Sequence, residues 1–78
     1  MEGLERLNSV SVGQSVIVVR LNMLGNSRRR MLDMGLTPGT RVDVVRKSPL
    51  GDPTAYCVRN SIIALREVES RHIMVEHC

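Results

Sequence analysis

Aromatic side chains are almost missing from this chain of 78 residues. It has no phenylalanine and no tryptophan, and Tyr56 is its only aromatic residue. Proteins that bind single-stranded nucleic acid by stacking need several aromatic side chains on which successive bases can lie. The composition therefore argues against this mode of nucleic-acid binding.

Long apolar segments are also missing from the sequence. The opening residues 1–6 lack the basic and then apolar pattern of a signal peptide, and no apolar run reaches the length of a membrane span. Because nothing indicates secretion, the two cysteines, Cys57 and Cys78, are predicted to be reduced thiols. We expect one domain over residues 1–78, located in the cytoplasm and not inserted in a membrane.

Positive charge comes almost entirely from arginine. The net charge is +3, and Lys47 is the only lysine among the 11 basic residues. A guanidinium group can bind a carboxylate or a phosphate through two parallel hydrogen bonds. This composition favours a partner with an acidic surface.

The segment 26–39 predicts one short helix. Asn26 or Ser27 can cap its first turn by accepting a backbone N–H group that has no partner within the helix. Gly35 is expected to end the helix in the left-handed conformation, with Leu36 folding back onto the last turn.

Three arginines crowd the start of this helix. Arg28, Arg29 and Arg30 lie where the helix dipole already carries partial positive charge, and only Asp33 is near enough in the sequence to offset them. Residues that break a local rule in this way often belong to a functional site. The alternative is a charged face that contacts only solvent.

Five β-strands are predicted from runs rich in β-branched residues or from alternation of apolar and polar residues. They cover residues 15–21, 40–47, 54–59, 62–66 and 72–76, with a two-residue hairpin turn at Asn60-Ser61. Leu4 and Leu7 are predicted to lie on a helical turn packed against the core. A chain of this length can arrange such strands only as a small, strongly bent sheet or barrel, so the fold class is mainly β, with the helix covering one open side.

A rigid loop separates two of these strands. Pro49 and Pro53 fix the backbone, and Gly51-Asp52 makes the bend. Leu50 within this loop is either a side chain that fills the core or an exposed anchor for a partner.

The sequence carries no catalytic motif. It has no phosphate-binding glycine loop of the Walker type and no nucleophile elbow. We therefore predict no enzyme, no catalytic residue and no cofactor.

A metal site and a nucleic-acid surface are the alternatives to a protein-binding module. Cys57, His72, His77 and Cys78 provide nitrogen and sulfur ligands, but their spacing matches no compact metal motif, so no metal ligand within the chain is predicted. The alternative is a weak dimer bridged by a metal through the His77-Cys78 end. Nucleic-acid binding would rest on phosphate neutralisation by the arginines, which acidic residues interrupt in the sequence.

The chain resembles the FeoA family. Four motifs carry the resemblance in order and spacing: residues 30–39, Pro49–Pro53, 63–67 and 73–75, within a match from about Leu4 to Glu76. The family usually has glycine where Asn60 stands, and asparagine can adopt the same backbone. The resemblance implies an SH3-like barrel of about five strands with one inserted short helix.

The resemblance also implies a function. FeoA proteins are cytosolic partners of FeoB, the membrane transporter of ferrous iron with a GTP-binding domain, and are thought to regulate it. The implied partner-binding residues are Arg28, Arg29, Arg30, Pro49, Leu50, Gly51, Asp52 and Pro53. On this hypothesis the arginines pair with carboxylates of the transporter and Leu50 fills an apolar pocket. A sharper version places one arginine on the nucleotide as a catalytic finger.

Overall fold

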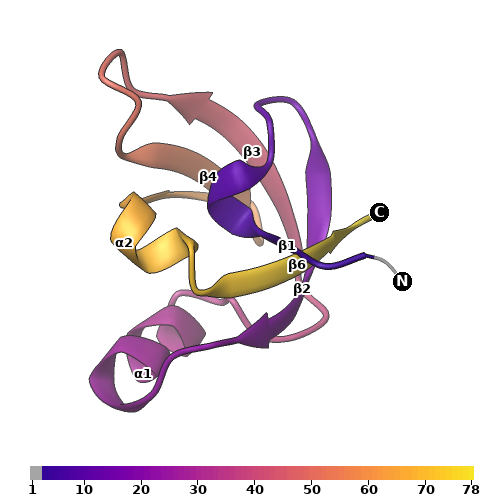
Figure 1. The fold of residues 1–78 in the computed structure, drawn as a ribbon, viewed down its shortest axis with the longest axis vertical. Coiled ribbons are helices and arrows are strands. Elements are labelled where there is room, and N and C mark those ends of the chain that lie inside the picture. The colour runs from indigo at the N-terminus through magenta and orange to yellow at the C-terminus, as the bar shows by residue number, and fades with distance from the viewer. Residues whose placement is uncertain (1–2) are drawn as a thin grey trace.

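One antiparallel sheet of six strands forms most of the molecule (Figure 1). The computed structural model describes residues 3–78. Its elements in chain order are β1 (Glu5–Arg6), the 3-10 helix η1 (Leu7–Ser9), β2 (Ser15–Leu21), α1 (Gly25–Asp33), β3 (Arg41–Lys47), β4 (Thr54–Val58), β5 (Ser61–Leu65), α2 (Glu67–Ser70) and β6 (Ile73–His77). The strand order is β1-β6-β2-β3-β4-β5. The mainly β fold is thus confirmed, and the two-residue strand β1 is an addition to the five strands predicted.

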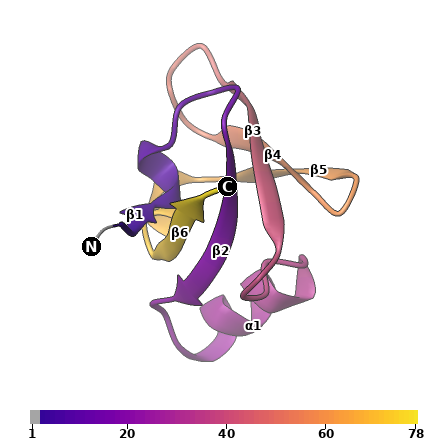
Figure 2. The same cartoon turned by 90° about the vertical axis from the view of Figure 1, so that its right-hand side faces the viewer.

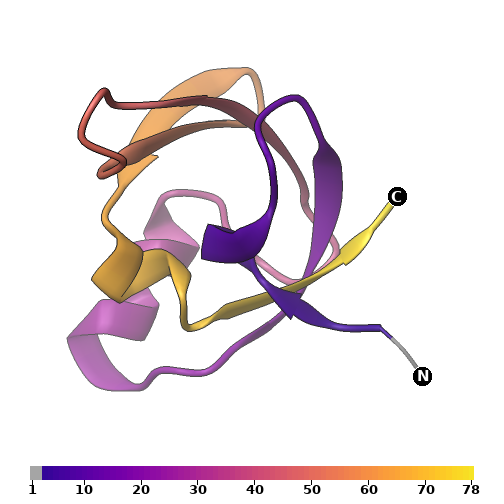
Figure 3. The same ribbon diagram turned by 45° about the horizontal axis from the view of Figure 1, so that its top comes forward.

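Strand β2 lies at the centre of this sheet. Val16 pairs with Val42 of β3, and Val18 pairs with Val75 of β6. Register shifts interrupt the ladder between Val18 and Arg20, and between residues 44 and 46 of β3. Such irregularities bend strands and increase their twist. The sheet accordingly curls around a common core, with α1 across one end (Figures 2 and 3).

The core is built from alternate residues of the strands. Val42 and Val44 of β3 are buried, as are Ile73 and Val75 of β6, in agreement with the predicted alternation. Tyr56, only 1% exposed, is the one aromatic side chain among them. Burial raises the pKa of Tyr56, an effect partly offset by its side-chain hydrogen bonds with Ser70 and Thr54.

The predicted turns differ from the structure in two places. The hairpin between β4 and β5 turns at Arg59-Asn60, whose φ angles of 51° and 67° are both positive, and not at Asn60-Ser61. Two positive φ angles are typical of the turn type whose twist matches a two-residue hairpin. Leu7 is buried on η1 as expected, but Leu4 is 44% exposed, because the chain before η1 is the edge strand β1 and not a helix.

A bilayer span would need a longer and more apolar helix than any that residues 3–78 contain.

Candidate docking surface

Helix α1 starts earlier than the sequence suggests. It begins at Gly25, its N-cap is Leu24, and no side chain caps it. The prediction that Asn26 or Ser27 caps the first turn was therefore wrong. The missed signal is Gly25, whose φ of 65° lets the chain turn into the helix one residue before the polar pair.

The end of α1 follows the prediction. Gly35 has a φ of 94°, its N–H donates to the carbonyl of Leu32 at 3.0 Å, and the N–H of Leu36 donates to the carbonyl of Met31 at 3.0 Å. This is the double hydrogen bond of a Schellman motif. Leu36 and Met31 are both buried, so the apolar side of α1 is anchored in the core and its arginines face outward.

The three arginines of α1 do not act as one group. Arg30 forms an ion pair with Glu69 of α2. Arg28 and Arg29 lie on another side of the helix, around a shallow hollow that includes Leu24. Within residues 3–78, neither Arg28 nor Arg29 forms an ion pair. Their positive charges are therefore the ones that α1 presents outward.

The loop at Pro49–Pro53 is held by its own hydrogen bonds. The hydroxyl of Ser48 donates to the carbonyl of Asp52 at 2.7 Å, and the N–H of Gly51 donates to the carbonyl of Ser48 at 2.8 Å. Leu50 at the tip is 95% exposed. Leu50 therefore does not fill the core. Of the two alternatives for this residue, the structure agrees with an exposed side chain.

Helix α2 lies between this loop and α1. The N–H of Glu67, at the start of α2, donates to the carboxylate of Asp52 at 2.9 Å, and Glu69, two residues later, pairs with Arg30. Figures 1 and 3 show the loop, α2 and α1 following one another along one side of the molecule. The predicted residues therefore share a side, but the loop and the arginines occupy its two ends.

A groove of about 360 Å³ separates α1 from α2. Its lining includes the apolar side chains Leu24, Met31 and Val68, together with His72 and the Arg30–Glu69 pair. Leu24 is 86% exposed and Val68 is 61% exposed. We call this hollow the α1–α2 groove. The sequence alone did not indicate this groove, because Leu24 and Val68 lie far apart in the chain.

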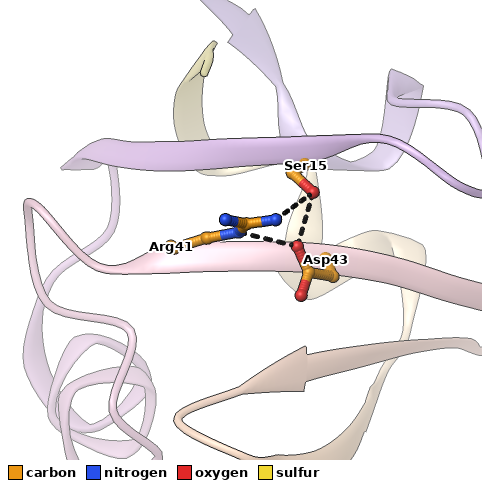
Figure 4. Close-up of polar contacts among 3 residues, drawn as sticks. All are labelled: Ser15, Arg41 and Asp43. Carbon is orange, nitrogen blue, oxygen red and sulfur yellow. Dashed lines mark hydrogen bonds and ion pairs between the residues drawn. The ribbon is translucent and has the colours of Figure 1, made fainter.

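A second polar cluster joins β2 to β3 (Figure 4). Ser15 donates a hydrogen bond to Asp43 at 2.6 Å, and Arg41 donates to Asp43 at 3.0 Å and to Ser15 at 3.1 Å. The hydrogen bond from Ser15, followed by that from Arg41, lowers the pKa of Asp43. Since Arg41 is engaged with a carboxylate, it adds little to a surface that would neutralise phosphates.

The candidate metal ligands are spread over the fold. Cys57 lies in β4, His72 precedes β6, and His77 pairs with Glu5 across β6 and β1. Among residues 3–78, no group of three or more His, Cys, Asp or Glu side chains is placed to hold a metal ion. The cysteines Cys57 and Cys78 are free thiols.

Comparison with known proteins identifies the fold and the family. The model of the FeoA domain matches residues 5–77. The solution structure of a FeoA-like protein from Clostridium acetobutylicum superimposes with a TM-score of 0.90 at 34% identity, covering 99% of this chain and 90% of that one. Stenotrophomonas maltophilia FeoA in complex with zinc, described as a procaryotic SH3 domain protein, gives 0.78 at 27% identity, covering 91% and 88%.

A longer relative carries the same domain. The Fe(2+) transport protein A/Fe(2+) transporter FeoB fusion protein of Porphyromonas gingivalis is 34% identical over 71 residues. The match covers 91% of this chain and only 8% of that protein. With a family model matched along almost its whole length and an SH3-like fold shared with solved relatives, the chain belongs to the FeoA domain family, a family of non-enzymatic accessory domains.

Proposed function

We propose that this chain is a regulatory accessory domain of ferrous iron transport that docks, on the cytosolic side, on a FeoB-type transporter. The observation that carries the proposal is the Porphyromonas gingivalis relative, in which a homologous domain and FeoB form one polypeptide. A covalent link keeps two domains at high effective concentration, which benefits domains that must contact each other to work. Separate chains would have to make the same contact through their surfaces.

The α1–α2 groove is the apolar part of the proposed contact. Leu24 and Val68 are large apolar side chains that remain mostly exposed beside a hollow. A few side chains that become fully buried carry most of the binding free energy at an interface, and Leu24 and Val68 are placed to become buried in this way. Leu50, at the far end of the same side, is the second anchor.

Positive charge on α1 orients the proposed contact towards an acidic partner surface. Arg28 and Arg29 present positive charge next to Leu24, so they fit an acidic surface on the GTP-binding part of the transporter. Arg30 is paired with Glu69 and instead holds α1 against α2. Pro49, Gly51, Asp52 and Pro53 shape the loop that presents Leu50.

Calorimetric titration with the GTP-binding part of a FeoB-type transporter tests this assignment. We expect the double charge reversal Arg28→Glu/Arg29→Glu to weaken binding by about tenfold or more, since like charges would then face each other. The matched control, Arg6→Glu/Arg20→Glu, makes the same change in net charge at exposed residues of β1 and β2 and should bind nearly as tightly as the native chain. Equal weakening by both variants would show that net charge matters and that the surface at α1 does not.

Apolar anchoring is tested separately. Val68→Lys should weaken binding by about tenfold, because a charge would enter the α1–α2 groove. Val45→Lys places the same charge at an exposed valine of β3 and serves as its control. Tight binding by Val68→Lys would remove the groove from the contact.

A dimer bridged by metal is the second candidate, and the zinc complex of the Stenotrophomonas maltophilia relative favours it. His77 lies beside Glu5, and Cys78 follows it at the end of β6. Within residues 3–78 these groups make no complete site, so a second copy would supply the remaining ligands. Zinc should then produce a dimer that His77→Ala abolishes, as measured by light scattering after gel filtration.

A further inference from the structure

The two edges of the sheet differ in how they are protected. At one edge, β1 has only two residues, and both are charged. At the other edge, β5 runs over Ser61–Leu65 and contains no charged residue and no proline. Short length, charge, proline and bulges are the usual devices that keep sheet edges from pairing. The edge at β5 has no charged residue, no proline and no bulge.

The hydrogen-bonding groups at this edge follow from the hairpin. In a two-residue hairpin, the residues that flank the turn, Val58 and Ser61, share a hydrogen bond. Alternation along an antiparallel ladder then directs the N–H and C=O groups of Ile62 and Ala64 away from β4. Within residues 3–78, β5 has β4 as its only strand neighbour, and no hydrogen bond from another segment reaches Ile62 or Ala64.

The side chains at this edge are apolar as well as exposed. Ile62 is 62% exposed, and Ala64, on the same face of the strand, is also exposed. An edge that combines unpaired backbone groups with apolar side chains is a template for a further strand.

We propose that β5 pairs with β5 of a second copy of this chain, which joins the two sheets across a two-fold axis at Ile63. In this antiparallel register, Ile62 of each copy lies opposite Ala64 of the other. Each such pair can exchange two hydrogen bonds, giving four across the interface. A contact between identical surfaces closes on itself and forms a dimer without growing further.

The composition of the strand favours this occupant. No residue of β5 from Ser61 to Leu65 carries a charge, so two copies of the strand bring no like charges together in this register. The outward N–H and C=O groups of Ile62 and Ala64 in one copy match those of the same residues in the other, so the edge complements itself. One pair of strands is a small interface, so we expect the association to be weak. The contact uses neither the His77-Cys78 end nor a metal ion.

Sedimentation velocity in the presence of a chelator tests the dimer up to about 1 mM protein, the range in which weak contacts form. We expect the mass to rise from the monomer value of 8.7 kDa towards twice that value. Ile62→Lys, which places two like charges in the interface, should remain monomeric. Val12→Lys is the matched control, because Val12 is a similarly exposed valine in a turn, and it should associate like the native chain.

A second variant guards against a change of fold. Ala64→Pro removes one outward-facing N–H group per copy, a substitution that edge strands tolerate, and it should also abolish association. In the native chain, the amide NMR signals of Ile62 and Ala64 should shift with concentration. A native chain that stays monomeric at about 1 mM, an Ile62→Lys variant that still dimerises, or a Val12→Lys variant that loses association equally would each overturn the proposal.

Discussion

At the scale of single residues, Arg59 connects two turns that lie far apart in the sequence. From the hairpin between β4 and β5, its guanidinium donates to Thr37 at 3.2 Å and to Thr40 at 3.1 Å. Its side chain also covers Gly35, where an added Cβ would lie 3.1 Å from Cδ of Arg59. Gly35 thus has two roles. It ends α1 in the left-handed conformation, and its lack of a side chain leaves room for the side chain of Arg59.

Replacing Gly35 tests this double role. Gly35→Ala should lower the free energy of unfolding by about 2 kcal/mol, because alanine is strained at positive φ and its methyl group would displace Arg59. The control is Gly39→Ala, which has a φ of 95° and open space around the new methyl group. It should lose only about 1 kcal/mol in urea unfolding. Equal losses would mean that Arg59 makes no contact of consequence with residue 35.

The cluster at Asp43 predicts a dependence of stability on pH. Because hydrogen bonds from Ser15 and Arg41 lower its pKa in the folded state, Asp43 stabilises the fold above the ordinary aspartate pKa of about 3.9. This stabilisation is lost as the pH falls through the lower pKa of the folded state. Asp43→Asn should therefore be less stable than the native chain at pH 7, by a small amount since the group is partly exposed.

Urea unfolding at several pH values measures this effect. The stability difference between Asp43→Asn and the native chain should shrink as the pH falls below about 4. A difference that stays constant with pH would show that Asp43 contributes nothing through its charge.

At the scale of elements, the sequence predicted the strands more closely than the connections. Strand β2 spans Ser15–Leu21 as predicted, and the inward alternation of β3 and β6 is confirmed. The start of α1 and the β4–β5 turn were displaced by one residue or more. Both errors have a backbone cause. Gly25 and Arg59 adopt positive φ angles, whereas the helix had been expected to begin at a polar cap and the hairpin to turn at Asn60-Ser61.

Candidate sites were harder to predict than strands. The exposure of Leu50 and the outward direction of Arg28 and Arg29 agree with the predicted docking residues, whose role in binding stays a prediction. The α1–α2 groove was missed because α2 brings Val68 next to Leu24 only in three dimensions. The pairing of Arg30 with Glu69 has the same cause, since the two residues are 39 positions apart in the chain.

The hydrogen bond from the Glu67 N–H to the Asp52 carboxylate, which joins the loop to α2, gives a prediction at this scale. Asp52→Ala removes the acceptor of the Glu67 N–H and should cost about 1 kcal/mol, similar to the loss of a helix cap. Amide hydrogen exchange should accelerate at Glu67 and along α2. The control, Leu50→Ala, changes a side chain that contacts little and should leave stability within about 0.5 kcal/mol of the native value. Unchanged amide hydrogen exchange in Asp52→Ala would show that this hydrogen bond does not stabilise α2.

At the scale of the whole molecule, the first and last strands lie away from the proposed docking side. Figures 1 and 3 show the start of β1 and the end of β6 on the side opposite the loop, α2 and α1. The molecule measures about 30 Å along its longest axis. A tether at either end, like the covalent link in the Porphyromonas gingivalis relative, would leave the docking side uncovered.

The central claim is that this chain docks on a FeoB-type transporter through one side of the molecule. An amide NMR titration with the GTP-binding part of such a transporter tests it most directly, because every backbone N–H group reports on its own surroundings. We predict shifts concentrated at Leu24–Leu32, at Val68 and at Leu50, with the strands β3 and β4 unaffected. Shifts spread over β3 and β4, or none at saturating partner, would contradict the account.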